Sequence, residues 1–148
     1  DLFAVCENVK KNLEVAAQAM EVEMSLSGKK AEIEGIPELL ETIVFNLCDN
    51  AIKYNRPGGS VSVEVRETED KAILSVSDTG IGIPSGEEEK VFERFYRVDK
   101  SHSRETGGTG LGLSIVKRGS LLHDAEIELK SEFGKGTQIR ILFPKKRG

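Results

Sequence analysis

Two hydrophobic periods alternate along this chain, and no other sequence feature restricts its possible folds as strongly. Apolar residues three or four apart are typical of amphipathic helices, and apolar residues at every second position are typical of half-buried strands. The expected segments, in chain order, are a helix at 1–20, a strand pair at 22–33, a helix at 37–54, a strand pair at 61–76, a helix at 111–122 and a strand pair at 125–142. This order predicts an α+β fold, a two-layer α/β sandwich in which helices cover one face of a mostly antiparallel mixed sheet.

Residues that favour chain reversals and helix starts support these boundaries. Asp1 is a suitable cap for the first helix, and Pro37 fits the first turn of the second. Gly28 lies between alternating residues on either side, so the segment 22–33 is expected to be a hairpin. With 148 residues the chain can bury one core, and a single domain over residues 1–148 is expected.

Composition and charge exclude several classes of protein. The net charge of −4 argues against a nucleic-acid partner, which usually meets a clustered positive surface. Cys6 and Cys48 fall at apolar helical positions and are expected to be reduced, as in a cytoplasmic domain. His102 and His123 lack companions at metal-ligand spacing, so a zinc site is not expected. The sequence has no signal-peptide pattern and no apolar run of about 18 residues, so this chain is not expected to span a membrane. A longer parent protein could be anchored in the inner membrane by other segments.

The second expected helix carries a row of polar residues. At about 100° per residue, Asn46, Asn50 and Lys53 fall close together, opposite the apolar stripe that contains Leu40 and Val44. A solvated helix face would explain this row. However, asparagine is a poor helix former, and two of them inside a helix suggest a function such as supplying carbonyl oxygens to a hard cation.

Asp78 follows the alternation of Ala72, Leu74 and Val76, so its carboxylate is expected to point to the buried side of the sheet. Aspartate commonly starts a turn, and that is the simpler explanation. The glycines of the following DTGIGIP segment (78–84) favour a binding role instead, because they let a ligand approach the backbone closely. An inward carboxylate there could accept a hydrogen bond from an amino group on a ligand ring.

A third candidate is the segment GGTGLGLSIVK (107–117), whose glycines lie directly before a helix. Such a loop presents backbone N–H groups and a helix N-terminus, which suit phosphate oxygens. The spacing matches neither the P-loop, which requires a lysine followed by serine or threonine, nor the dinucleotide-binding GxGxxG pattern. A glycine-rich hinge without a ligand remains the alternative.

Five segments together resemble the conserved boxes of a known family. In order they are NLCDNAIKYN (46–55), DTGIGIP (78–84), VFERFYRVD (91–99), GGTGLGLSIVK (107–117) and GKGT (134–137). They resemble the histidine-kinase catalytic domain of the Bergerat ATPase superfamily, and the resemblance spans nearly the whole chain. It implies the Bergerat fold, an α/β sandwich that holds ATP beneath a flexible lid.

The resemblance also implies roles for individual residues. Asn50 would coordinate Mg²⁺ at the phosphates of ATP with support from Asn46, and Asp78 would accept a hydrogen bond from the adenine amino group. Lys53 and Arg97 would contact the phosphates, and Arg97 could neutralise the γ-phosphoryl charge. The other nucleotide-binding positions would be Tyr54, Gly80, Gly82, Gly108, Thr109, Gly110, Leu111 and Gly112, with Phe92 and Phe95 as the anchor of the lid.

The function implied is that of a catalytic domain which transfers the γ-phosphoryl group of ATP to a histidine. No histidine here lies in a helix before an acidic residue, so the phosphoacceptor helical domain would be a separate part of the same protein. A response regulator would act downstream, and this chain alone would not autophosphorylate. Related ATPases have a glutamate at the position of Asn46, and an amide cannot activate water, so hydrolysis should be slow. The alternatives are a serine kinase or ATPase of the same superfamily, and a regulatory nucleotide-binding module.

Overall fold

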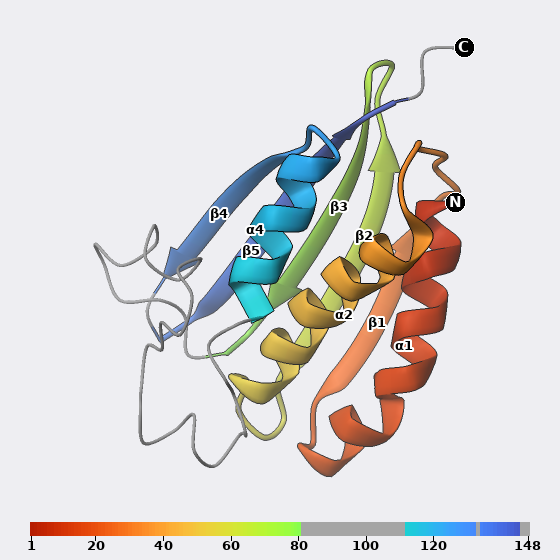
Figure 1. Ribbon diagram of the computed structural model, residues 1–148. Helices are drawn as coiled ribbons and strands as arrows, with labels where there is room; N and C mark the ends of the chain where they lie inside the picture. The colour runs from red at the N-terminus through yellow and green to blue at the C-terminus, as the bar shows by residue number, and fades with distance from the viewer. Residues whose placement is uncertain (81–111, 133, 146–148) are drawn as a thin grey trace.

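The structure is a computed structural model that describes residues 1–80, 112–132 and 134–145. In this part of the chain three helices lie side by side on one face of a five-stranded sheet (Figure 1). The elements are α1 (Leu2–Ala19), β1 (Glu23–Gly28), α2 (Pro37–Lys53), β2 (Ser60–Glu67), β3 (Lys71–Asp78), α4 (Gly112–Leu122), β4 (Glu126–Glu132) and β5 (Gly136–Pro144). The predicted two-layer sandwich is therefore confirmed.

The strands are arranged in the order β1-β2-β3-β5-β4. β1 and β2 are parallel and α2 connects them, whereas the other three neighbouring pairs are antiparallel. The two later hairpins predicted from the sequence, β2–β3 and β4–β5, are both present. β3 is the central strand, and its last residue, Asp78, pairs with Val61 of β2 and Thr137 of β5.

The core lies between the helices and the sheet. Every residue of the predicted apolar stripe of α2 is buried, as are the inward residues of β2, β3 and β5. Each fully buried Val, Leu, Ile or Phe side chain among them contributes roughly 1.5–3 kcal/mol by leaving water. Cys6 and Cys48 are buried in this layer as free thiols. Burial raises the pKa of Cys6 to about 12 and also raises the pKa of Cys48, so both thiols stay neutral.

Helix starts agree with the expectations at α1 and α2. The carboxylate of Asp1 accepts a hydrogen bond from the backbone N–H of Phe3 at 2.9 Å, as an N-cap residue should. Pro37 occupies the first turn of α2, where its missing N–H costs nothing. Ile36 precedes it at the cap position and cannot supply a side-chain acceptor.

The hairpin expected over residues 22–33 is wrong, since only Glu23–Gly28 forms a strand. The backbone of Gly28 has φ 117° and packs closely on β2. A Cβ at this position would lie 2.0 Å from the Val65 carbonyl oxygen. The chain then leaves the sheet, and Ala31 packs on the start of α1. Its carbonyl accepts from the N–H of Leu2 at 2.9 Å, which satisfies one of the free donors of that helix. The N–H of Ala31 also donates to Asp1 Oδ1 at 3.4 Å, and the N–H of Lys29 donates to the Val65 carbonyl at 3.1 Å, so these groups are paired without a second strand.

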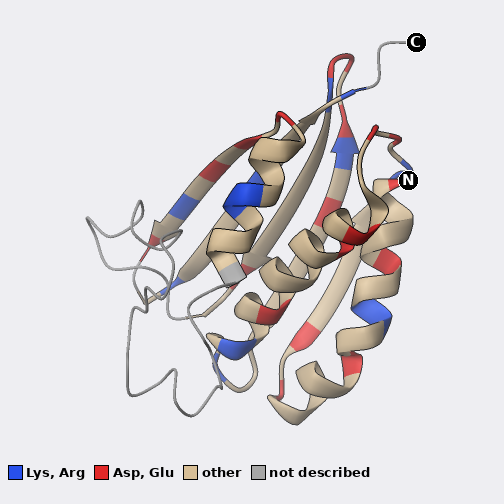
Figure 2. Ribbon diagram, in the orientation of Figure 1, with Lys and Arg blue, Asp and Glu red and all other residues tan. Residues whose placement is uncertain are grey.

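Charged residues are spread over the helices and along the β4 edge (Figure 2). In β4 the alternate residues Glu126, Glu128, Lys130 and Glu132 are exposed, and charges on an edge strand discourage pairing with another chain. Among the described helices none is both long enough and apolar enough to cross a bilayer.

Candidate functional site

Asp78 lies at the inner side of the sheet, as its parity in β3 predicts. Its pairing partners across the sheet are Val61 and Thr137, and its side chain is half-buried. One carboxylate oxygen, Oδ1, accepts from the N–H of Gly80 at 2.9 Å and from the N–H of Thr137 at 3.3 Å. Burial raises the pKa of Asp78, and these two hydrogen bonds oppose that rise. Among the described residues, no group donates to Oδ2.

Two glycines bring backbone close to this carboxylate. A Cβ on Gly80 would lie 2.4 Å from the Tyr54 carbonyl oxygen, and a Cβ on Gly136 would lie 2.1 Å from the Asp78 carbonyl oxygen. Gly136 also has φ 141°, a conformation that other residues rarely adopt. The wall beside Asp78 is therefore built largely of main chain, which suits the edge of a planar ring.

Thr137 and Gly136 had no predicted role, although both belong to the GKGT segment (134–137). Ser131 supports this strand end, because its hydroxyl donates to the Gly136 carbonyl and contacts Thr137 Oγ1 at 3.0 Å. In the sequence, the spacing of two glycines before a strand was the indication that this segment has a role in the site. Only strand pairing indicates that the N–H of Thr137 reaches Asp78.

A second contact set joins the end of α2 to the residues after Asp78. Asn55 is 5% exposed, and its amide donates to the Ser60 carbonyl at 2.9 Å. Its Oδ1 accepts from Thr79 Oγ1 at 3.3 Å, and Thr79 in turn accepts from the N–H of Ser60 at 2.9 Å. This buried network fixes the turn after α2 against the segment that carries Asp78.

The polar row of α2 lies on the flank of the helix rather than opposite its apolar stripe. The three residues of this row, Asn46, Asn50 and Lys53, are half-buried. Toward the N-terminus of α2 the row continues to Ile43, which is buried. The amide nitrogen of Asn46 donates to the Thr42 carbonyl at 2.8 Å, so its carbonyl oxygen faces away from the helix backbone. This leaves an oxygen suited to a hard cation or its water shell.

Lys53 is not a free cation in this structure. Its ammonium group lies 3.0 Å from a carboxylate oxygen of Asp49, one turn earlier in α2. The pair is partly buried and lies at i,i+4 on one helix, where such pairs contribute roughly 0.3–0.5 kcal/mol. A phosphate could therefore displace Asp49 from Lys53 at low cost.

The packing of α4 on α2 places the start of α4 near Asn50. α4 runs opposite to α2 (Figure 1), and a Cβ on Gly119 would lie 2.8 Å from Ile43 Cδ1. Gly112 lies seven residues before Gly119, about 10 Å along the helix axis. The same distance along α2 from Ile43 reaches Asn50. The N-terminus of α4, which is the positive end of its helix dipole, is thus level with the asparagine row.

Several predicted site residues lie outside the described part of the chain. They are Gly82, Phe92, Phe95, Arg97, Gly108, Thr109, Gly110 and Leu111. Tyr54 is described and is half-buried at the C-terminal end of α2. The structure therefore brings Asp78, Gly80 and Tyr54 together at one end of the sheet, and Asn46 and Asn50 beside the start of α4.

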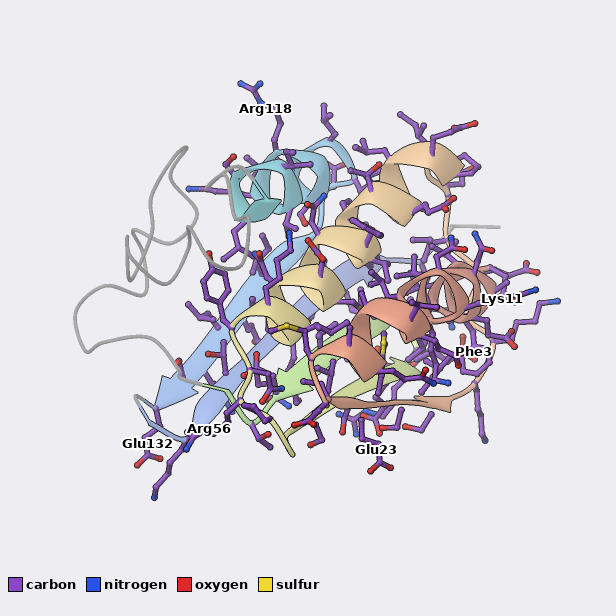
Figure 3. The ribbon with its side chains drawn as sticks, turned by 90° about the horizontal axis from the view of Figure 1, so that it is seen from below. Phe3, Lys11, Glu23, Arg56, Arg118 and Glu132 are labelled. Carbon is purple, nitrogen blue, oxygen red and sulfur yellow. The ribbon has the colours of Figure 1, made fainter. Side chains whose placement is uncertain are left out.

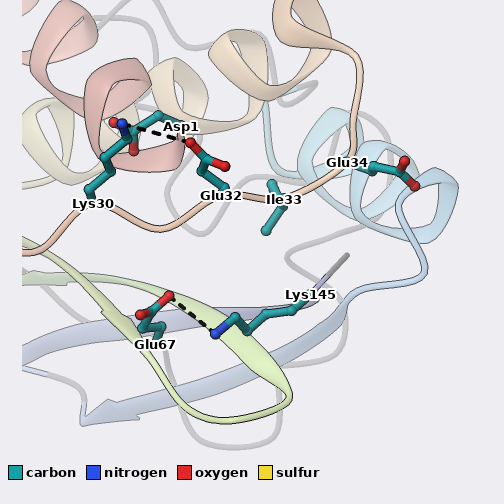
Figure 4. Close-up of a pocket in the computed structure, with 7 residues that line it drawn as sticks. All are labelled: Asp1, Lys30, Glu32, Ile33, Glu34, Glu67 and Lys145. Carbon is teal, nitrogen blue, oxygen red and sulfur yellow. Dashed lines mark ion pairs between the residues drawn. The ribbon is translucent and has the colours of Figure 1, made fainter. Parts of the chain in front are cut away.

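Two cavities differ in their suitability for an anionic ligand. One of about 380 Å³ lies beside Asp78, at the ends of β3, β4 and β5. In its lining Lys130 and Lys135 offset the charges of Asp78 and Glu132, and no described residue of α2 or α4 takes part. The other, of about 800 Å³, is at the opposite end of the sheet (Figure 4). It is lined by Asp1, Lys30, Glu32, Ile33, Glu34, Glu67 and Lys145. Acidic residues outnumber the lysines, which pair with Glu32 and Glu67. A phosphate would be repelled there.

The fold and the site together define a class of protein. An open mixed sheet covered on one face by helices, with an inward carboxylate beside glycines at one end, is the architecture of an ATP-binding α/β sandwich domain. The family described as histidine kinase-, DNA gyrase B- and HSP90-like ATPase matches residues 35–147. The chain belongs to this family and is an ATP-binding domain of the histidine-kinase type.

Individual relatives agree with this assignment. The signal transduction histidine-protein kinase ArlS of Staphylococcus aureus is 42% identical over 118 residues, which are 80% of this chain and 26% of ArlS. The mycobacterial sensor histidine kinase MprB matches with a TM-score of 0.87 and 30% identity, over 100% of this chain and 98% of that structure. The catalytic domain of histidine kinase ThkA shares the fold, with a TM-score of 0.83 and 23% identity over 97% of this chain and 94% of that chain. The chain spans about a quarter of the length of the curated relatives it matches.

Proposed function

We propose that this domain binds Mg-ATP and positions its γ-phosphoryl group for transfer to a histidine on a separate helical domain. The observation that carries the proposal is Asp78, whose Oδ1 is held by two backbone N–H groups while Oδ2 receives no hydrogen bond from the described residues. The amino group of adenine could donate a hydrogen bond to Oδ2. Gly80 and Gly136 supply a flat backbone wall beside it.

The phosphates would lie between α2 and the start of α4. Backbone N–H groups at Gly112, and the preceding residues Gly108, Thr109, Gly110 and Leu111, would donate to phosphate oxygens. Asn50 and Asn46 would hold Mg²⁺ through amide oxygens, and the orientation of the Asn46 amide supports this fit. The ion, when bound, would neutralise phosphate charge. Lys53, Tyr54, Gly82 and Arg97 would complete the nucleotide contacts.

Transfer is favoured over hydrolysis by the residue at position 46. A water nucleophile needs a base, and the amide of Asn46 cannot accept a proton at neutral pH. An imidazole is itself a nucleophile, so it needs only alignment with the γ-phosphorus. The bond to the β–γ bridging oxygen breaks as the N–P bond forms, and ADP leaves. The contribution of this domain is positioning and charge stabilisation.

Partners follow from the same chemistry. The histidine that accepts the phosphoryl group would lie on a helical domain of the same protein, and a response regulator would take the group afterwards. The curated relatives are about three times as long as this chain, which supports further domains in proteins of this type. The domain would work in the cytoplasm, where ATP is available, with its parent protein anchored in the inner membrane.

Calorimetry with ATP tests the binding part of the proposal. The expected result is one site whose affinity rises when Mg²⁺ is added. Asn50→Asp should change the Mg²⁺-dependent part of the binding free energy, because a charged carboxylate replaces a neutral amide ligand. An unchanged metal dependence in that variant would remove Asn50 from the site. A folded wild-type protein with no affinity for millimolar ATP would refute the proposal.

A mixing experiment tests the transfer part. The domain is combined with a separately produced histidine-bearing helical domain and ATP labelled at the γ-phosphate. Acid-labile label on histidine is the expected result. Label on serine, or rapid release of phosphate, would indicate the serine kinase or ATPase instead. Binding without transfer or release would indicate a regulatory nucleotide-binding module.

A further inference from the structure

Arg56 joins two chain segments that both contact Asp78. It follows α2 in the turn before β2, and its Nη2 donates to the Gly80 carbonyl at 3.0 Å and also to the Gly134 carbonyl. Gly80 follows β3, whereas Gly134 lies in the turn between β4 and β5. In Figure 3, Arg56 and Glu132, the last residue of β4, are labelled at the same end of the molecule.

The backbone of Arg56 is itself held in place. Its N–H donates to Oδ1 of the buried Asn55 at 2.9 Å. A Cβ on Gly59 would lie 2.1 Å from the same oxygen, so the turn closes tightly around Asn55. The guanidinium therefore extends from a braced turn rather than from a loose loop. Because the backbone of this turn is already ordered, holding the guanidinium against two carbonyls costs side-chain entropy but little further backbone entropy.

The two carbonyls belong to the backbone that shapes the carboxylate site. Gly80 donates its N–H to Asp78 Oδ1 and accepts at its carbonyl from Arg56, so both of its polar groups are fixed. Gly134 lies two residues before Gly136, which packs against the Asp78 carbonyl. Thr137, next in sequence, is the second donor to Oδ1. Arg56 thus links the two donor segments that orient one carboxylate.

We propose that Arg56 is a positioning residue for base recognition, which holds the Gly80 and Gly134 segments so that Asp78 distinguishes an amino group from a carbonyl on a purine ring. This inference rests on the proposed binding of ATP by Asp78. Both hydrogen bonds come from one nitrogen, Nη2, whose two N–H groups lie in the fixed plane of the guanidinium, whereas the three donors of an ammonium rotate and hold no fixed angle between the two carbonyls. Arg56 touches main chain and no reacting atom, so it acts through Asp78.

The test compares affinities for ATP and for inosine triphosphate, which has a carbonyl in place of the 6-amino group. Calorimetry is performed on the wild type, Arg56→Ala and Arg56→Lys, with thermal unfolding of each. Arg56→Ala should lower the ratio of ATP affinity to inosine triphosphate affinity about fivefold. Without Arg56 the Gly80 and Gly134 segments are held less firmly, so the Asp78 carboxylate can shift away from a ring carbonyl. Arg56→Lys should give an intermediate ratio. If Arg56→Ala does not fold, the lysine variant alone decides, and a wild-type ratio there overturns the proposal.

The matched control is Arg66→Ala, which removes an arginine from the far end of β2 that pairs with Glu64 at 2.9 Å. Its affinity ratio should equal that of the wild type. A lower unfolding temperature in Arg56→Ala with an unchanged ratio would mean that Arg56 is structural only, and would overturn the inference while leaving the proposed function intact. A wild type that fails to bind ATP, or binds both nucleotides equally, would instead refute base recognition by Asp78 itself.

Discussion

At the scale of single residues, Asp78 combines two opposing influences on one carboxylate. Burial disfavours its charge, and two backbone N–H groups on Oδ1 favour it. Burial is the stronger influence, so the pKa of Asp78 lies above its ordinary value. The same arrangement fixes the direction of the second oxygen. A ligand donor that reaches Oδ2 would stabilise the ionised form.

Asp78→Asn should weaken ATP binding strongly while leaving the fold intact. Both backbone donors require an acceptor, so the amide oxygen should occupy the place of Oδ1 and the NH₂ group should face the adenine amino group. Losing a charge-assisted hydrogen bond costs about 1.5–3 kcal/mol, or roughly 10-fold to 100-fold in affinity. Calorimetry with ATP measures the effect, and circular dichroism checks the fold. Wild-type affinity in a folded variant would exclude Asp78 from base recognition.

The raised pKa of Asp78 also predicts how stability depends on pH. Between the ordinary value of 3.8 and the higher folded value, the folded state binds more protons than the unfolded state. Stability from this group is therefore complete below 3.8 and is lost as pH rises through the folded pKa. The free energy of unfolding, measured in urea across acidic pH, should fall in the wild type relative to Asp78→Asn over that window. A relative gain with rising pH would contradict the assignment.

At the scale of elements, α4 is held on α2 at two places. Gly119 permits close approach to Ile43, and His123 at the C-terminal side of α4 meets the start of α2. The N–H of Ile36 donates to His123 Nε2 at 3.1 Å, so the other ring nitrogen, 2.8 Å from the Gly119 carbonyl, carries the proton. The imidazole thereby accepts a hydrogen bond from a backbone N–H at the start of α2, where the side chain of Ile36 cannot cap the helix. It also fixes how far α4 is displaced along α2.

Gly119→Ala should destabilise the domain although alanine is the better helix former. The gain in helix propensity is about 1 kcal/mol, whereas overpacking against a fully buried Ile43 costs about 1–3 kcal/mol. The net loss should be about 1 kcal/mol in urea unfolding. Ile43→Val removes the nearest atom, so the double variant should lose less than the sum of the single changes. Additive losses would show that Ile43 is not the obstacle.

At the scale of the whole molecule, one helical layer and one sheet share a single continuous core. The proposed nucleotide site uses residues from α2, β3, β5 and α4, so a ligand would connect the helical layer to the sheet. The far end of the sheet, with its acidic cavity, is separate from that site. Binding should therefore stabilise the domain as a unit.

We expect one cooperative unfolding transition that ATP shifts to higher temperature. At 100 times the dissociation constant, ligand binding adds about 2.7 kcal/mol, which corresponds to roughly 5–10 °C for a domain of this size. Scanning calorimetry with and without Mg-ATP measures the shift, with inosine triphosphate at equal concentration as the control. Two separate transitions, with only one moved by ATP, would contradict a single domain.

The sequence alone determined the elements and the faces of their residues. Hydrophobic period is a local property, so it predicted the three described helices, the β2–β3 and β4–β5 hairpins and the inward direction of Asp78. The cap at Asp1 was likewise predictable, because its partner, Phe3, is two residues away. Consecutive strands joined by short turns left few alternatives for pairing.

The tertiary structure decided which distant segments meet. β1 pairs with β2 instead of with the residues after Gly28, since Gly28 packs on Val65 and Ala31 satisfies the start of α1. Contacts between residues far apart in sequence decide how α4 is placed along α2. They also decide that Thr137 is the second donor to Asp78 and that Arg56 bonds to Gly80 and Gly134. Periodicity specifies which face of an element is buried. It does not specify the neighbour, because several partners could bury the same face, and only packing of the whole core selects one.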